Sequence, residues 1–118
     1  MKRNFTLQEQ RNTVKSKIHH NKRHVLNKMV NVNNSFRHEA AKLLRGLELV
    51  YEGCEVLVEA EFTNGTGIAD LLITDVDWCE EILESETMER FKQKKYPVTK
   101  IIPNKASEVI KRCIKEEL

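Results

Sequence analysis

The chain has 118 residues, of which 40% are hydrophobic and 32% are charged, and its formal net charge is +2. This length predicts one compact domain with one modest core, and no apolar run approaches the roughly 18 residues that cross a bilayer. Residues 1–10, MKRNFTLQEQ, lack the apolar stretch of a signal peptide. Three cysteines without a CxxC pair argue against a disulfide framework and against a thiolate zinc site. We therefore expect an intracellular, cytoplasmic protein with no membrane partner.

Positive and negative charges are segregated along the chain. Residues 1–34 contain eight lysines and arginines against the single acid Glu9, whereas residues 48–89 contain no lysine or arginine. This pattern predicts a basic arm that binds a polyanion and an acidic centre that has a separate role. The alternative interpretation of the arm is a helix face that is simply solvated. The candidate nucleic-acid-binding residues are Arg11, Lys15, Lys17, Lys22, Arg23 and Lys28.

The basic arm is predicted to be helical. Thr6 and Glu9 have the spacing of a capping box, so a helix is expected to begin there. Apolar residues then follow at spacings of seven and four, which gives a narrow stripe suited to one docking seam. The stripe consists of Leu7, Val14, Ile18, Val25 and Met29. We assign residues 1–33 to a basic helical N-terminal extension.

A second helix is predicted over residues 36–49. Its apolar face is formed by Phe36, Ala40, Leu43, Leu44 and Leu47, which recur at helical spacing. Glu39 falls on the flank of that face, where a carboxylate can point toward the surface on which the helix packs. His38 falls opposite the face and is expected to be exposed.

The remaining elements predict an α/β domain over residues 34–118. Strands are expected at residues 54–62, 68–74 and 79–85, a short helix at 86–95, and a fourth strand at 98–102. Ser107 is expected to cap a last helix. Three consecutive strands followed by a helical crossover predict a mixed central sheet of about four strands flanked by helices.

Three acids come from three separate predicted elements, namely Glu39 on the helix, Asp70 on the second strand and Glu81 on the third. Two unit charges about 4 Å apart repel by roughly 4 kcal/mol at an effective dielectric constant of about 20. A bound cation would offset this repulsion, and Mg²⁺ or Mn²⁺ prefers oxygen ligands. The sequence therefore predicts an acidic metal site.

The stretches FRHEAAKLL, EVLVEAEF, GIADLLITD, EEILESE and KKYPVTKIIP resemble the PD-(D/E)xK nuclease superfamily, which has the restriction-endonuclease-like fold. The resemblance covers about residues 36–103. It implies Mg²⁺-dependent hydrolysis of phosphodiester bonds in DNA. It also implies that Glu39, Asp70 and Glu81 are the metal ligands, because they match the family's helix glutamate, second-strand aspartate and third-strand glutamate.

The chain departs from the family at one position. The family's lysine lies two residues after Glu81, and Leu83 stands there in this chain. Such a lysine orients the attacking water and stabilises charge in the transition state. Lys42 on the preceding helix and Lys92 on the following helix are candidates to replace it.

Two further interpretations of the missing lysine remain open. Glu84 and Ser85 could take part while the metal carries more of the catalysis, or the site could be degenerate and bind nucleic acid without cutting it. More than one glutamate in or near the third strand could match the family's position, depending on the register of the strand. We favour Glu81 over Glu80, Glu84 and Glu86, because it matches the family's glutamate followed by apolar residues and then Ser-Glu.

These observations together predict a Mg²⁺-dependent deoxyribonuclease, acting as an endonuclease or a junction resolvase. Its catalytic set would come from Glu39, Asp70, Glu81, Lys42, Lys92, Glu84 and Ser85. The alternative is a catalytically inactive nucleic-acid-binding module of the same fold, and a third possibility is an interaction protein whose basic helix pairs with an acidic partner. DNA is the expected partner. A homodimer is expected as well, because nucleases of this fold that act on duplexes or junctions often work as pairs.

Overall fold

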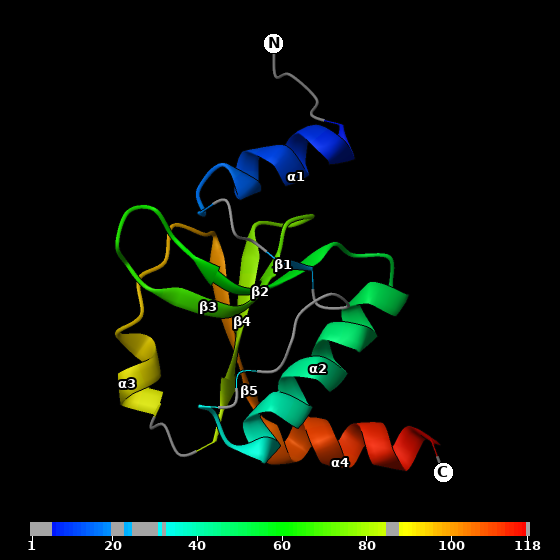
Figure 1. The fold of residues 1–118 in the computed structure, drawn as a ribbon. Helices are drawn as coiled ribbons and strands as arrows, with labels where there is room; N and C mark the ends of the chain where they lie inside the picture. Colours follow the sequence, from blue (N-terminus) through cyan, green and yellow to red (C-terminus); the bar gives the residue numbers. More distant parts are fainter. Residues whose placement is uncertain (1–5, 20–22, 25–30, 32, 85–87, 118) are drawn as a thin grey trace.

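The computed structural model describes residues 6–19, 23–24, 31, 33–84 and 88–117 (Figure 1). In chain order its elements are α1 (Leu7–Lys15), β1 (Arg23–His24), α2 (Phe36–Tyr51), β2 (Val56–Glu61), β3 (Ile68–Ile73), β4 (Trp78–Leu83), α3 (Met88–Lys92), β5 (Lys100–Lys105) and α4 (Ala106–Glu117). The predicted α/β class, with helices around a mixed sheet, is confirmed. Within the described residues, no helix is both long enough and apolar enough to cross a membrane.

The sheet has the strand order β1-β2-β3-β4-β5. Strands β2, β3 and β4 form an antiparallel meander, and β5 lies parallel to β4. The parallel pair follows from the connection, because a strand can return in the same direction only after a crossover, and α3 lies in that crossover. The four longer strands have six residues each, while β1 contributes two residues at the edge beside β2.

Apolar side chains cover both faces of the sheet. One core cluster joins Val14 and Ile18 of the N-terminal segment to Leu57, Leu72 and Cys79 of the sheet. The neighbouring sheet residues point the other way, as side chains alternate along a strand. A second cluster therefore forms there, from Leu49 of α2 with Val56, Val58, Leu71 and Ile73. Helix α4 joins α2 through a third cluster of Ala41, Ile82, Ala106 and Val109. The sheet thus lies between the N-terminal segment and α2.

The N-terminal segment differs from the predicted continuous helix. Helix α1 begins at the expected capping box, where Thr6 accepts a hydrogen bond from the Glu9 N–H, but it ends at Lys15. Ile18 then forms a β-bridge with Phe62, and β1 pairs with β2. The outer edge of β2 would otherwise leave backbone N–H and C=O groups unpaired, which favours a strand at this place. Val25 and Met29 lie outside the described residues, and the domain boundary at residue 33 stays a prediction.

Helix α2 also differs from its predicted face. Phe36 is the first residue of the helix and is 89% exposed. The buried residues of α2 are Glu39, Ala41, Lys42, Gly46 and Leu49, so the buried stripe contains charged side chains. At the other end of the chain α4 begins at Ala106, directly after β5, which places Ser107 inside the first turn rather than at the cap.

We predict that the N-terminal segment is part of the folding unit. Ile18→Ala should lower the free energy of unfolding by about 2–5 kcal/mol, because Ile18 is only 4% exposed within the core. Leu7→Ala is the matched control, since Leu7 is 53% exposed, and it should change the free energy by less than about 0.5 kcal/mol. Urea denaturation of both variants provides the measurement. Equal, small effects of the two substitutions would show that the segment is only an appended arm.

Candidate active site

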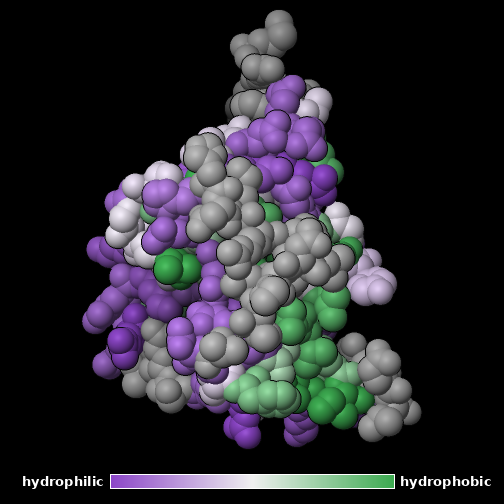
Figure 2. Space-filling view, in the orientation of Figure 1, coloured by the Kyte–Doolittle hydropathy of each residue, from purple (hydrophilic) through white to green (hydrophobic). Residues whose placement is uncertain are grey.

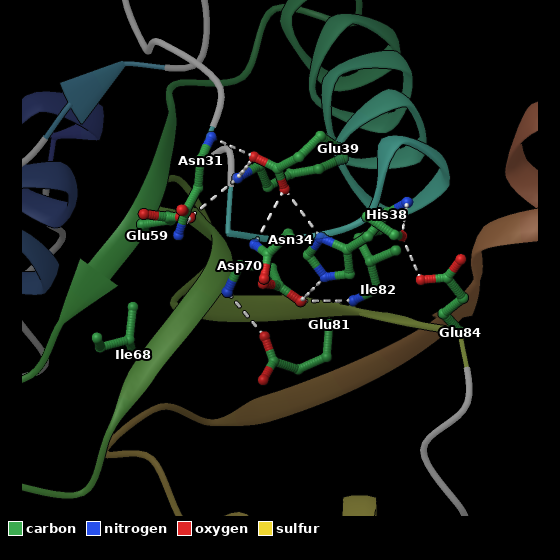
Figure 3. Close-up of polar contacts among 12 residues, drawn as sticks. Asn31, Asn34, His38, Glu39, Glu59, Ile68, Asp70, Glu81, Ile82 and Glu84 are labelled. Carbon is green, nitrogen blue, oxygen red and sulfur yellow. Dashed lines mark hydrogen bonds and ion pairs between the residues drawn. The ribbon is translucent and has the colours of Figure 1, made fainter.

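Strands β3 and β4 separate at the position of two acids. Their pairing includes Leu71 with Glu80, and the next pair along the ladder would be Asp70 with Glu81. Side chains replace the backbone ladder there. The Asp70 N–H donates to Glu81 Oε2 at 2.7 Å, and the Ile82 N–H donates to Asp70 Oδ2 at 2.8 Å (Figure 3). The two carboxylates are therefore fixed side by side in the gap between the strands.

Glu81 is the more buried of the two acids. Its side chain is 2% exposed, and Oε1 accepts hydrogen bonds from Lys94 Nζ and from the Tyr96 hydroxyl, both at 2.8 Å. Burial raises the pKa of Glu81, the charge of Asp70 raises it further, and the contact with Lys94 opposes both. Glu80, the neighbouring candidate for the catalytic glutamate, instead contacts Arg45 Nε at 2.7 Å. The geometry thus favours Glu81 over Glu80.

His38 lies between the helix acid and the strand acid. Its Nδ1 is 2.9 Å from Glu39 Oε2, and its Nε2 is 3.5 Å from Asp70 Oδ2 (Figure 3). The contact with Asp70 raises the pKa of His38 most, the contact with Glu39 adds to it, and together they outweigh burial and bring it to about 9. The predicted exposure of His38 is wrong, because its side chain is 15% exposed. The His38 imidazole therefore lies between Glu39 and Asp70 and keeps the two carboxylates apart.

A buried lysine neutralises Glu39. Lys42 Nζ lies 2.8 Å from Glu39 Oε1 and 3.1 Å from Glu59 Oε1, and the Lys42 side chain is 1% exposed. Burial alone would raise the pKa of Glu39, but hydrogen bonds from Lys42, the Asn31 N–H and His38 lower it to about 2. Glu59 has a φ of 47° and stands between the paired positions Val58 and Ala60. Lys42, a predicted replacement for the missing lysine, therefore contacts Glu39 and Glu59.

The cation that reaches Glu81 is Lys94, which the sequence reasoning missed. Lys92 ends α3 and is exposed, and among the described residues it makes no ion pair with the site acids. The chain turns after α3, and Lys94 and Tyr96 lie over the strands. Gly67 leaves room for this path, because a Cβ at that position would lie 3.0 Å from Tyr96 Cε1. The Tyr-Pro step was the available signal, since a helix usually ends before such a step and the chain after it can turn back.

The acids line an open cleft of about 270 Å³. Its lining residues are Asn34, Ser35, His38, Ile68, Asp70, Glu81, Ile82, Glu84 and Lys94. Glu84 accepts a hydrogen bond from the Ser35 hydroxyl, while Ser85 and Glu86 lie outside the described residues. Leu83 is buried and supplies no cation.

The predicted set of three carboxylates is only partly assembled. Within the described part of the chain, no group of three or more histidine, cysteine, aspartate or glutamate side chains is arranged to hold a metal ion. Asp70 and Glu81 do come together, and Glu39 stands behind His38. A pair of carboxylates still fits Mg²⁺, which is bound by one or two carboxylates together with waters and substrate phosphates.

The basic residues of the N-terminal segment contact the acidic centre of the chain. The described ion pairs of its lysines and arginines are Arg11 with Asp75 (2.9 Å), Lys15 with Glu55 (3.0 Å) and Lys17 with Asp77 (3.2 Å). Part of the charge segregation seen in the sequence is therefore explained by ion pairs within the protein. Lys22 and Lys28 lie outside the described residues, and of Arg23 only the backbone is described. DNA binding by this segment stays a prediction.

No protein-family model, no curated protein and no solved structure matches this chain. The resemblance around Glu39, Asp70 and Glu81 therefore stays a prediction from the sequence.

We predict that His38 titrates with a pKa of about 9 and that Asp70→Asn moves it back toward the ordinary value of 6.5. The folded-state pKa lies above the unfolded one, so the His38 contacts contribute stability fully below pH 6.5 and lose it as the pH rises through about 9. NMR titration of the imidazole Cε1–H in both proteins tests this. An unshifted pKa in the wild type would contradict the contact with Asp70.

Proposed function

We propose that this protein is a metal-dependent DNA endonuclease whose reacting centre is the cleft between β3 and β4. The observation that carries the proposal is the arrangement of Asp70, Glu81 and Lys94. Two carboxylates are held together in an open cleft, and a lysine contacts the more buried one. Both acids line an open cleft, and titratable groups gathered in a cleft often mark a functional site, which favours a function over a purely structural role.

Asp70 and Glu81 would hold Mg²⁺ or Mn²⁺. When bound, such an ion polarises the phosphodiester and lowers the pKa of the attacking water. The hydrogen bond from the Ile82 N–H fixes the Asp70 carboxylate in place, and the Asp70 N–H does the same for Glu81. Glu39 becomes available as a further ligand only when the His38 imidazole leaves its position between Glu39 and Asp70.

Lys94 would take the role of the lysine that the family has where this chain has Leu83. Hydrolysis adds the oxygen of water to phosphorus and breaks one phosphorus–oxygen ester bond, which leaves one phosphate end and one hydroxyl end. Negative charge grows on the phosphate oxygens during this step. The Lys94 ammonium, which lines the cleft, stabilises that charge.

A catalytically inactive DNA-binding module is the second candidate, and a specific observation favours it. The site acids already have protein cations as partners: Lys42 for Glu39, His38 for Asp70 and Lys94 for Glu81. A bound metal is therefore not required to offset their repulsion. Cleavage separates the two candidates.

Pairing of two copies remains part of the proposal. Ile114 of α4 is 55% exposed, and Figure 2 shows apolar surface over the region where α2 and α4 meet. Exposed apolar patches often mark interaction sites. This surface supports the expected homodimer.

We predict that the wild type cleaves DNA in the presence of Mg²⁺, assayed on linear duplexes and four-way junctions. Asp70→Asn should abolish cleavage, and Lys94→Ala should lower kcat about 10²–10³-fold through loss of transition-state stabilisation. Lys111→Ala is the matched control, because Lys111 is an exposed lysine on α4. Its kcat should equal that of the wild type.

One outcome would contradict the site that we propose, and another would contradict the nuclease assignment. Cleavage by Asp70→Asn at the wild-type rate would show that the cleft between β3 and β4 is not the reacting centre. Binding of DNA by the wild type without cleavage of any substrate would favour the inactive module.

A further inference from the structure

A second basic segment lies next to the candidate active site. Residues 90–105 contain six lysines and arginines and no aspartate or glutamate. The cations are Arg90, Lys92, Lys94, Lys95, Lys100 and Lys105. The segment starts in α3 and continues through β5, so it is part of the described fold. The preceding 16 residues, 74–89, contain seven acidic residues and no lysine or arginine, so the sign of the charge changes where this segment begins.

The cations at the start of this segment are placed differently from those of the N-terminal segment. Lys92 and Lys95 are exposed, and neither makes an ion pair with another described residue. Arg11, Lys15 and Lys17, in contrast, are already bound to carboxylates of the protein. A phosphate can be contacted by Lys92 and Lys95 without breaking an existing ion pair.

An open hollow beside the candidate active site is lined by Lys95, whereas Lys92 lies on α3 outside this lining. The hollow has a volume of about 470 Å³ and is lined by Thr66, Arg90, Gln93, Lys94, Lys95 and Tyr96, with no acid among these residues. Lys94 also lines the cleft that contains Asp70 and Glu81. The hollow and the cleft therefore meet at Lys94, which lies between a basic surface and the proposed reacting centre.

We propose that the phosphate backbone of DNA docks on the surface formed by α3 and the loop after it, and passes over Lys94 into the cleft. The proposal rests on the proposed nuclease function for its choice of polyanion. Lysine contacts to phosphate supply most of the sequence-independent affinity of such proteins, and hydroxyl and amide groups such as those of Thr66 and Gln93 also bind phosphate oxygens.

The aromatic side chain of this surface, Tyr96, is already engaged within the protein. The Tyr96 ring packs against Phe62 with ring centroids 5.1 Å apart, and its hydroxyl is bound to Glu81, so it is not available to stack on a base. The docking surface therefore offers charges and hydrogen bonds to the backbone.

Fluorescence anisotropy with a labelled DNA duplex, in EDTA so that the DNA stays intact, tests the proposal. The variant is Lys92→Gln/Lys95→Gln, in which neither lysine has an ion pair to lose among the described residues. The matched control is Lys111→Gln/Lys115→Gln, which makes the same change of charge on the C-terminal half of α4, and α4 runs away from α3 (Figure 1). A third protein, Lys15→Gln/Lys17→Gln, tests the N-terminal segment.

We expect the α3 variant to bind about tenfold more weakly and to reduce the slope of log K against log salt concentration by about two, one for each lost phosphate contact. The α4 control should keep the wild-type slope. Equal losses in the α3 and α4 variants would overturn the proposal, and so would a larger loss in the N-terminal variant.

Failure of this proposal is distinguishable from failure of the nuclease assignment. If the α3 variant shows the expected loss and the wild type cleaves nothing, the docking surface stands and the nuclease assignment falls. If the wild type cleaves DNA and the α3 variant binds as tightly as the wild type, the nuclease assignment stands and the docking surface falls.

Discussion

The site depends on two hydrogen bonds, which the Glu81 and Asp70 carboxylates accept from the backbone N–H groups of Asp70 and Ile82. Antiparallel strands normally satisfy their backbone N–H groups from each other, and β3 and β4 stop doing so at these two residues. The carboxylates take over, since the N–H groups of Asp70 and Ile82 donate to Glu81 and Asp70. Because a buried N–H without a partner costs free energy, the acids are structural elements as well as candidate ligands.

Asp70 and Glu81, in the gap between β3 and β4, are each in contact with a cationic side chain of the protein. Lys94 contacts Glu81, and His38 contacts Asp70. Lys42 pairs instead with Glu39 and Glu59. Repulsion between the acids therefore does not by itself require a metal ion, because protein cations already offset the charges. What favours a metal site is the position of the two carboxylates in an open cleft beside a basic surface.

Local patterns in the sequence predicted most of the fold and part of the site. The strands around Val56, Ile68 and Trp78 were found within a few residues, because alternation and turn residues are local signals. His38 was misplaced because the helix was oriented by its apolar residues. Its buried stripe contains Glu39 and Lys42, which can be buried only because Glu59, from another element, pairs with the lysine. Lys94 was missed because its contact with Glu81 depends on the path of a loop, which no periodicity encodes.

The most direct test of the account is where a divalent cation binds. Substoichiometric Mn²⁺, followed by paramagnetic broadening of backbone amide signals, should selectively broaden those of Asp70 and Ile82. Asp70→Asn should remove this broadening. Broadening at the acids near the N-terminal segment, such as Asp75 and Asp77, or no selective broadening at all, would contradict a metal-dependent active site in the cleft between β3 and β4.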